Sequence, residues 1–346
     1  MVKRMGILTG GGDCPGLNPA IRGTVYGAVR RGWECVGLME GWKGLMEAQT
    51  VTLNLETAEE LINKGGTCLG TSRTNPYKKE GGPQACAENF RKLGLDALVA
   101  MGGDDTLGVA MKLNRDSKIP VVGVPKTMDN DLSGTDYTFG FDTSVTVALD
   151  ALERLRDTGR SHRRIMVLEV MGRHAGWVAL FTAVAGGADY CCIPERKVDA
   201  EDMVDKLRKA YGRKKYAIVV ASEAAELPVI GEDIHLHRHK LDEFGHQILK
   251  ERGVAEKLSA LIEKKTGMET RSAVIGHIQR GGSPTLFDRM LATRVGLKAA
   301  ELVHEGKFGL MVALQGCEVK GVPLEVAVGR LKTVSKEWLD IADMLF

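Results

Sequence analysis

Two glycine and carboxylate motifs contain the residues of this chain best suited to chemistry. Gly102-Gly103-Asp104-Asp105-Thr106 follows the apolar run Ala97–Met101, and Pro125-Lys126-Thr127-Met128-Asp129-Asn130-Asp131 follows the run Val121–Val124. Paired glycines let a backbone approach a phosphate closely, while carboxylates bind magnesium or accept a proton. The two motifs therefore predict a phosphate site at which a proton is also transferred.

Three carboxylates in these motifs have separate candidate roles. Asp104 is the candidate magnesium ligand, because Mg²⁺ takes only one or two carboxylates and completes its shell with water and phosphate oxygens. Asp129 is the candidate base for a substrate hydroxyl, and an Asx turn is the alternative explanation. Asp105 needs its own explanation, since a second carboxylate repels a phosphate unless the ligand is short and a cation such as Lys126 is close. Asp105 or Thr106 could instead cap the helix that begins near Leu107.

Other glycines and arginines extend the prediction of a phosphate site. The loop Gly10–Asn18 lacks the Lys-Thr or Lys-Ser of a Walker loop, so phosphate binding at Gly11 and a simple tight turn both remain open. Arginine matches phosphate with two parallel hydrogen bonds. Any single arginine is also explained as a surface ion-pair partner, but several follow or precede glycine-rich strand ends, namely Arg73, Arg164, Arg173, Arg271 and Arg280. Their shared placement favours a phosphorylated substrate.

Alternating strand and helix patterns must position these loops. Short apolar runs predict nine strands, at Met5–Thr9, Cys35–Leu38, Ala97–Met101, Val121–Val124, Ile165–Val170, Tyr190–Ile193, Ala217–Ala221, Ser272–Ile275 and Leu310–Leu314. Helical patterns lie between them, at Pro19–Arg31, Ala58–Asn63, Ala87–Leu93, Thr143–Arg156, Ala200–Ala210 and Arg289–Glu305. Continuous apolar strands with intervening helices are typical of parallel sheets covered on both faces. We expect an α/β fold of two doubly wound, mainly parallel sheet domains, with the active site in the cleft between them.

Composition narrows the class of protein. The 346 residues are 44% hydrophobic and 27% charged, with a formal net charge of +2, so no global charge favours nucleic acid or a membrane surface. The seven cysteines form no CxxC pair, which indicates a reduced, cytoplasmic protein. The apolar stretch Trp177–Ala188 is shorter than the ~20 residues of a membrane span. His235, His237 and His239 in Pro228–Phe244 are better explained by an exposed loop or strand edge than by a metal site, and Arg213-Lys214-Lys215 by a solvated turn.

Seven motifs together resemble the phosphofructokinase family over nearly the whole chain. They are TGGGDCPGLN near the start, GGTCLGTSR at 65–73, GGDDT, PKTMDNDL, GTDYTFGFDT at 134–143, VMGRHAGW at 170–177 and GHIQRGGSP at 276–284. The resemblance implies a phosphotransferase of glycolysis and gluconeogenesis that phosphorylates the 1-hydroxyl of fructose 6-phosphate. It also implies a donor domain of residues 1–140 and about 278–328, and a sugar-phosphate domain of residues 141–277 and about 329–346.

Roles follow from the resemblance residue by residue. Donor binding is implied for Gly11, Arg73, Thr74, Gly103, Asp105 and Thr106, and Mg²⁺ binding for Asp104. Catalysis is implied for Asp129 as general base, with Asp105, Lys126, Thr127 and Arg173. Sugar-phosphate binding is implied for Thr127, Met128, Asp129, Arg164, Met171, Gly172, Arg173, Glu223, Arg271, His277, Ile278, Gln279 and Arg280. Because Arg164 and Arg271 reach across a subunit interface in this family, we expect a homodimer or homotetramer with shared active sites.

Asp105 and Lys126 indicate the pyrophosphate-dependent branch of the family. ATP-using bacterial members typically have glycine at both positions. Pyrophosphate ends where ATP continues into its α-phosphate, so the Asp105 carboxylate would occupy that region and repel ATP. Two unit charges about 4 Å apart interact by several kcal/mol at an effective dielectric near 20, and Lys126 could neutralise a phosphate.

Three rival functions remain open. The nearest is an ATP-dependent phosphofructokinase that tolerates Asp105. NAD and lipid kinases share the GGD signature but lack the MGR and HIQRGGSP loops. A non-catalytic sugar-phosphate-binding regulator would be expected to lose Asp104 or Asp129, and both are present.

Regulation is expected to be weak or absent. The effector site of ATP-dependent bacterial members is a basic cluster, of which this chain keeps Arg22, Arg154 and Arg213-Lys214-Lys215. Tyr26 and Leu55 stand where that cluster has arginines.

Overall fold

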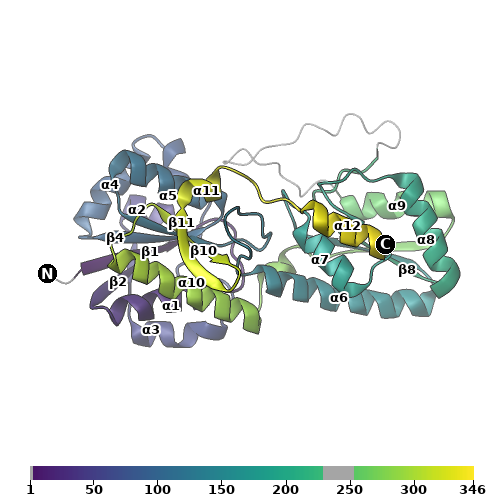
Figure 1. The fold of residues 1–346 in the computed structure, drawn as a ribbon, viewed down its shortest axis with the longest axis horizontal. Helices are drawn as coiled ribbons and strands as arrows, with labels where there is room; N and C mark the ends of the chain where they lie inside the picture. The colour runs from purple at the N-terminus through teal and green to yellow at the C-terminus, as the bar shows by residue number, and fades with distance from the viewer. Residues whose placement is uncertain (1–2, 229–252) are drawn as a thin grey trace. The chain divides into compact units, whose positions relative to one another are not determined.

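The computed structural model describes residues 3–228 and 253–346, in two compact units (Figure 1). The first unit comprises residues 1–128, 132–143 and 280–331, and the second comprises 129–131, 144–279 and 332–346. The three residues Asp129–Asp131 thus belong to the second unit although they follow a strand of the first. His235, His237 and His239 lie outside the described residues.

A seven-stranded sheet forms the centre of the first unit, in the order β11-β10-β5-β4-β1-β2-β3. The strands are β1 (Lys3–Thr9), β2 (Trp33–Leu38), β3 (Thr50–Leu53), β4 (Ala97–Gly102), β5 (Val121–Pro125), β10 (Leu310–Gln315) and β11 (Glu318–Pro323). The five inner strands are parallel, and β3 and β11 pair antiparallel at the two edges. Every residue of the central strand β4 is buried, which explains its unbroken apolar sequence.

Helices cover both faces of this sheet. They are α1 (Leu17–Val29), α2 (Trp42–Glu47), α3 (Leu55–Glu59), α4 (Gly82–Lys92), α5 (Asp104–Ser117), α10 (Leu286–His304) and α11 (Leu324–Val328), with 3₁₀ turns η1 (Glu60–Asn63) and η2 (Pro76–Lys78). Leu107 and Leu113 of α5 and Leu324 of α11 pack in one core with Leu98 and Met311 of the sheet. On the other face α1 and α10 approach closely, since a Cβ at Gly296 would lie 2.3 Å from the Ala20 carbonyl oxygen.

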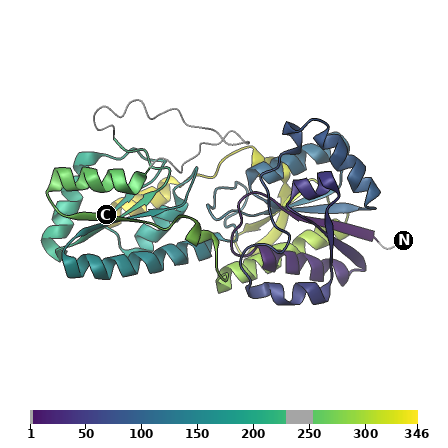
Figure 2. The ribbon, with the colours of Figure 1, turned by 180° about the vertical axis from the view of Figure 1, so that it is seen from behind.

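A four-stranded parallel sheet, β7-β8-β6-β9, forms the second unit. Its strands are β6 (Ile165–Val170), β7 (Tyr190–Cys192), β8 (Ala217–Ser222) and β9 (Thr270–Val274). Its helices are α6 (Phe141–His162), α7 (Trp177–Gly186), α8 (Ala200–Lys214), α9 (Val254–Thr266) and α12 (Lys336–Leu345), with the 3₁₀ turn η5 (Gly276–Arg280) (Figure 2). Leu207 of α8 and Leu258 of α9 share a core with Val167 and Val219 of the sheet.

The expected α/β class with two parallel-rich sheets is confirmed. The nine predicted strands are all present, with ends that differ by a few residues. The missed strands β3 and β11 are short antiparallel edges, and neither has an apolar run. The first three residues of β3 are exposed, and β11 mixes exposed and half-buried residues. The helix predicted at Ala58–Asn63 begins earlier, at Leu55, because Asn54 and Thr57 form a capping box. Within residues 3–228 and 253–346, no helix combines the length and low polarity needed to cross a membrane.

Candidate active site

Three neighbouring strands of the first unit end in the predicted donor loops. The backbone N–H of Gly10, after β1, donates to the Met101 carbonyl at 2.9 Å, and that of Lys126, after β5, donates to Gly102 at 3.0 Å. The N–H of Gly11 donates to the Ser72 carbonyl at 3.1 Å. The carboxyl ends of parallel strands are the usual ligand edge of such sheets, so these loops share one edge as predicted.

Glycines at two of these strand ends make room for one buried threonine. A Cβ at Gly102 would lie 2.3 Å from the Thr106 Cβ, and a Cβ at Gly10 would lie 2.6 Å from the Thr106 Oγ1. Thr106 is only 4% exposed. The Thr106 side chain therefore packs the two loops together, and its predicted contact with the donor stays a prediction.

Lys126 brings a buried positive charge to the first glycine loop. Its side chain is 4% exposed, and its Nζ donates a hydrogen bond to the Gly12 carbonyl. A Cβ at Gly11 would lie 3.5 Å from this Nζ, and Gly11 has a φ of 77°. Only glycine adopts such a conformation without strain, so the backbone stays open beside an ammonium group. A cation held in low-dielectric surroundings interacts strongly with a phosphate.

The second motif begins helix α5. Gly103 is the N-cap and no side chain caps the helix, so the alternative in which Asp105 or Thr106 serves as the cap is wrong. Asp104 and Asp105 lie in the first turn, Asp104 exposed and Asp105 half-buried. The first turn of a helix offers unpaired N–H groups and a positive dipole end, which favour anions.

Asp104 has the chemistry and the exposure of a magnesium ligand. Among residues 3–228 and 253–346, no group of three or more His, Cys, Asp or Glu side chains is arranged to hold a metal. Mg²⁺ does not need such a cage, because one carboxylate with waters and phosphate oxygens satisfies it. The residues present therefore fit Mg²⁺ bound jointly with a phosphate donor.

The loop that contains Arg73 and Thr74 is fastened to the first glycine loop. The Thr71 hydroxyl donates to the Gly11 carbonyl at 2.5 Å, and the Ser72 hydroxyl donates to the Glu40 carbonyl at 2.6 Å. The Thr74 N–H donates to the Ser72 hydroxyl oxygen at 3.3 Å. Thr71 and Ser72 are positioning residues that the sequence reasoning missed, although the motif GGTCLGTSR contains both.

Asn18 is a second missed positioning residue. It is 3% exposed, donates to the Gly65 carbonyl at 3.0 Å and accepts from the Cys68 N–H at 2.8 Å. Its amide thereby orders the start of the segment that leads to Arg73. In the sequence, Asn18 stands out only as a polar residue among the apolar residues that begin helix α1.

Arg280 lies in the first unit, against the glycine loop. Its Nη1 donates to the Asp13 carbonyl at 2.8 Å, and a Cβ at Gly12 would lie 2.8 Å from the same nitrogen. Arg280 thus adds a positive charge beside the predicted donor loop, while its contact with a sugar phosphate stays a prediction.

Cys14, next to these cations, is a buried thiol. Burial raises the pKa of Cys14 to about 12, although the charges of Lys126 and Arg280 act in the opposite direction. The side chain is 0% exposed. Cys14 therefore remains protonated at neutral pH and serves packing.

Strand ends of the second unit gather the predicted sugar-phosphate residues. Met171, Gly172 and Arg173 follow β6, and Glu223 follows the adjacent strand β8. The Gly172 N–H donates to the Glu223 Oε1 at 3.4 Å, and the Ser222 hydroxyl donates to the Gly172 carbonyl at 2.8 Å. Gly172 has a φ of 146°, a conformation that side chains rarely allow. The structure thus brings Gly172 and Glu223 together.

Gln279 holds this loop from within the protein. It is 0% exposed, its Oε1 accepts from the Met171 N–H at 2.8 Å, and its Nε2 donates to the Ser144 hydroxyl at 3.0 Å. These bonds make Gln279 a positioning residue for Met171, and its contact with substrate stays a prediction. His277 and Ile278, just before it in η5, are exposed.

The segment Asp129–Asp131 is held by the chain near its C-terminus. Asn130 is 2% exposed with a φ of 53°, and its Oδ1 accepts from the Lys332 Nζ at 3.1 Å. The Lys332 N–H donates to the Asp131 carbonyl at 2.8 Å. Thr127 and Met128 come just before this segment. The Thr138 hydroxyl donates a hydrogen bond to the Thr127 carbonyl at 2.6 Å, and Met128 is 1% exposed.

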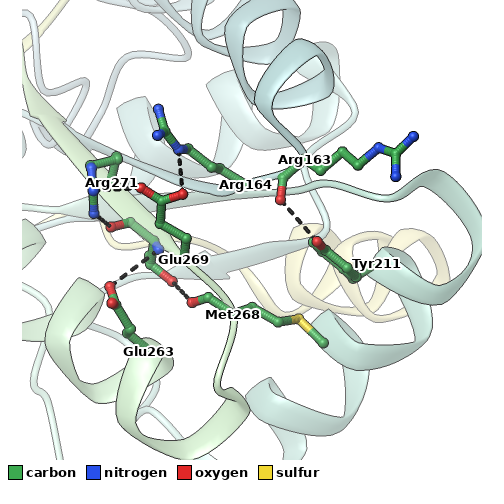
Figure 3. A network of polar contacts seen from close by, with 8 residues as sticks. Arg163, Arg164, Tyr211, Glu263, Met268, Glu269 and Arg271 are labelled. Carbon is green, nitrogen blue, oxygen red and sulfur yellow. Dashed lines mark hydrogen bonds and ion pairs between the residues drawn. The ribbon is translucent and has the colours of Figure 1, made fainter.

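Arg164 and Arg271 lie near the amino ends of strands of the second sheet, opposite the carboxyl ends described above. Arg164 precedes β6, whereas Met171–Arg173 follow it, and the six residues of β6 span about 20 Å. Both arginines share the Glu269 carboxylate, which Arg164 Nε approaches at 2.8 Å and Arg271 Nη2 at 2.5 Å (Figure 3). The Arg164 guanidinium, and then that of Arg271, holds the pKa of Glu269 below its usual value. The structure does not bring these two arginines to Gly172 and Glu223 of the same chain.

The candidate effector residues have ordinary local partners. The Arg22 guanidinium lies 4.4 Å from the Tyr26 ring centroid, and Arg154 pairs with Asp150 at 2.8 Å. Lys214 ends α8 and pairs with Asp189 at 2.6 Å. The absence of effector control stays a prediction.

Comparisons with known proteins agree over nearly the full length of the chain. A pyrophosphate–fructose 6-phosphate 1-phosphotransferase of Dictyoglomus thermophilum is 49% identical over 99% of this chain and 98% of its own. An ATP-dependent 6-phosphofructokinase 3 of Streptomyces coelicolor is 46% identical over 96% of both chains. Overall identity thus differs little between relatives named for the two donors.

Solved structures share the fold. A pyrophosphate-dependent phosphofructokinase of Nitrosospira multiformis superposes with a TM-score of 0.84 at 20% identity, over 97% of this chain and 87% of that one. The phosphofructokinase of Saccharomyces cerevisiae gives 0.81 at 26% identity over 99% of this chain, which spans 46% of the yeast chain. The family model described as Phosphofructokinase matches residues 4–303. With this match and the full-length relatives, the chain belongs to the phosphofructokinase family.

Proposed function

We propose that the protein is a pyrophosphate-dependent 6-phosphofructokinase. It transfers a phosphoryl group from pyrophosphate to the 1-hydroxyl of fructose 6-phosphate, and the products are fructose 1,6-bisphosphate and phosphate. The observation that carries the choice of donor is Asp105, a half-buried carboxylate in the first turn of α5. Relatives named for pyrophosphate, at 49% identity, support the same donor.

Different residues would act on the acceptor sugar and on the phosphoryl donor. Asp129 takes the proton of the 1-hydroxyl as the oxygen attacks the terminal phosphorus of pyrophosphate, and the bond to the leaving phosphate breaks. Lys126, buried beside Gly11 and Gly12, neutralises the charge on the donor. Asp104 would hold Mg²⁺, which supplies further charge neutralisation on the phosphates when bound. Gly172, Arg173 and Glu223 would bind the sugar phosphate.

We further propose that the active unit is an oligomer. Arg164 precedes β6, and Arg271 lies in β9 opposite the start of β6, whereas Gly172 follows the end of β6. The length of β6, about 20 Å, is too great for these side chains to serve the same site. In a symmetric dimer or tetramer they could serve a neighbouring subunit. This supports a homodimer or homotetramer whose sites are shared.

A coupled assay with fructose 6-phosphate and Mg²⁺ tests the donor. Pyrophosphate should support turnover, and phosphate with fructose 1,6-bisphosphate should drive the reverse reaction. Turnover with ATP but not with pyrophosphate would instead establish the alternative function, an ATP-dependent 6-phosphofructokinase. That alternative is supported by relatives at 44–46% identity. A protein that binds fructose 6-phosphate without turnover of either donor would be a regulator.

A further inference from the structure

Residues 329–346 form a C-terminal tail that lies outside the residues matched by the family model. Leu331 forms an isolated bridge with Leu132, and the next residue, Lys332, donates its backbone N–H to the Asp131 carbonyl at 2.8 Å. The tail thus pairs with the chain directly after Asp129 as a short added strand would.

The Lys332 side chain reaches the same segment from a second direction. Its Nζ donates to the Asn130 Oδ1 at 3.1 Å. Asn130 is 2% exposed and sits in the left-handed region with a φ of 53°, which costs free energy unless the surroundings hold it. Lys332 thus contributes support to Asn130 through its ammonium group and to the next residue, Asp131, through its backbone N–H.

The tail also holds the loop after β6. The Trp177 Nε1 donates to the Lys332 carbonyl at 2.9 Å, and the Lys332 Nζ lies 5.5 Å from the Trp177 ring centroid. Glu195 accepts from the Gly176 N–H at 2.9 Å and from the Val334 N–H at 2.9 Å. Farther along the tail, the ring of Trp338 in α12 packs against that of Phe181, with ring centroids 4.6 Å apart and ring planes tilted by 43°.

We propose that Lys332 is a positioning residue that couples the Asp129 segment to the loop Met171–Trp177. The proposal rests on the proposed function for the role of Asp129, but not on the identity of the donor. Lys332 uses its N–H, its carbonyl and its ammonium group for this purpose, and the partners Asp131, Trp177 and Asn130 belong to the second unit. A base displaced by a fraction of an ångström loses turnover more than it loses substrate affinity.

The variant Lys332→Met tests the ammonium group. Methionine keeps an unbranched apolar stem over Trp177 but cannot donate to Asn130. We expect kcat to fall by about 10- to 100-fold with the KM for fructose 6-phosphate within about twofold of wild type. Lys332→Arg, which keeps a cationic donor, should restore much of the loss. Lys336→Met is the matched control in the same tail, because Lys336 is exposed and pairs locally with Asp340 at 2.6 Å.

A second measurement does not depend on activity. Hydrogen–deuterium exchange of the peptide that covers residues 127–133 should rise in Lys332→Met and stay at the wild-type level in Lys336→Met. Should Lys332→Met not fold, Asn130→Gly removes the acceptor and still allows the left-handed backbone. Unchanged exchange, or a kcat loss that is equal in Lys336→Met, would overturn the proposal. A wild-type protein inactive with both donors would contradict the proposed function, while the exchange experiment would still test Lys332.

Discussion

At the scale of single residues, the proposed choice of donor rests on the side chain of Asp105. It lies half-buried in the first turn of α5, where the helix N-terminus would otherwise attract the α-phosphate of ATP. We predict that Asp105→Gly raises the ratio of ATP to pyrophosphate turnover by at least about tenfold, since one charge contact near 4 Å is worth several kcal/mol. Parallel assays with the two donors measure this ratio.

A matched variant separates charge from size at this position. Asp105→Asn keeps the shape of the side chain and removes its charge, so it should shift the ratio in the same direction. If Gly shifts the ratio and Asn does not, the carboxylate acts by occupying space. An unchanged ratio in both variants would show that Asp105 does not discriminate between donors.

Asp129 carries the second residue-scale prediction. Asparagine cannot take the proton of the 1-hydroxyl, so Asp129→Asn should lower kcat by about 10²- to 10⁴-fold. The KM for fructose 6-phosphate should change little, because the amide keeps the hydrogen-bonding shape of the site. Steady-state kinetics in the forward direction measure both. A kcat within about threefold of wild type would exclude Asp129 as the general base.

The sequence predicted the motif residues well where the backbone conformation requires a particular residue type, as it requires glycine at a positive φ. Gly11 and Gly172 have positive φ angles, which the glycine-rich strand ends already suggested. Burial was not predictable in the same way. Thr106 and Gln279 lie in the motifs, yet their side chains are used inside the protein because tertiary neighbours, invisible in one sequence, fill the space around them.

At the scale of elements, one buried carboxylate joins the starts of α6 and α10. Asp288 of α10 accepts from the Thr143 N–H at 2.8 Å and from the Thr143 hydroxyl at 2.5 Å. The N-cap residue Thr285 donates to Asp142 at 2.6 Å. The starts of the two helices are thus joined by hydrogen bonds in both directions.

This link predicts a pH dependence of stability. Asp288 is 0% exposed, and burial raises its pKa from 3.8 to about 6 despite the bonds from Thr143. Between pH 4 and 6 the folded protein therefore binds more protons at this carboxyl than the unfolded chain does, so its contribution to stability is lost as pH rises. Asp288→Asn should lack this component, which amounts to about 3 kcal/mol for a shift of about 2 units.

Denaturant unfolding at pH 4.5 and pH 7 measures the component. The stability of Asp288→Asn relative to wild type should be higher at pH 7 than at pH 4.5. Asp157→Asn, an exposed change on α6, is the control and should show no such trend. Equal differences at the two pH values would show that Asp288 titrates near its ordinary pKa.

Element order was largely predictable because parallel strands buried on both faces have unbroken apolar sequences. The edge strands β3 and β11 were not predictable, because each has one neighbouring strand and exposes residues such as Thr50 and Glu318. The contacts of the tail with the candidate site were also not predicted. Its contacts with Asn130 and Asp131 join residues about 200 positions apart, and no local pattern records them.

At the scale of the whole molecule, the predicted sugar-phosphate residues are divided between the two ends of the strands of the second sheet. Gly172 and Glu223 follow the carboxyl ends of β6 and β8, while Arg164 and Arg271 flank the amino ends of β6 and β9. Glu269 holds both arginines together at that end. In the proposed oligomer, these two guanidinium groups would bind the phosphate of a sugar phosphate in the site of a neighbouring subunit.

Subunit complementation tests this arrangement. Arg271→Ser and Asp129→Asn should each be nearly inactive alone. In a hybrid dimer of the two, one site combines the intact Asp129 of one subunit with the intact Arg271 of the other. With random assembly, half of the dimers are hybrids and each has one intact site, so coexpression should restore about a quarter of wild-type activity. Arg173→Ser with Asp129→Asn is the control, because both residues belong to one subunit's site and no hybrid site is intact. Absence of rescue in the first pair would place Arg271 outside the partner's site and contradict the shared assembly.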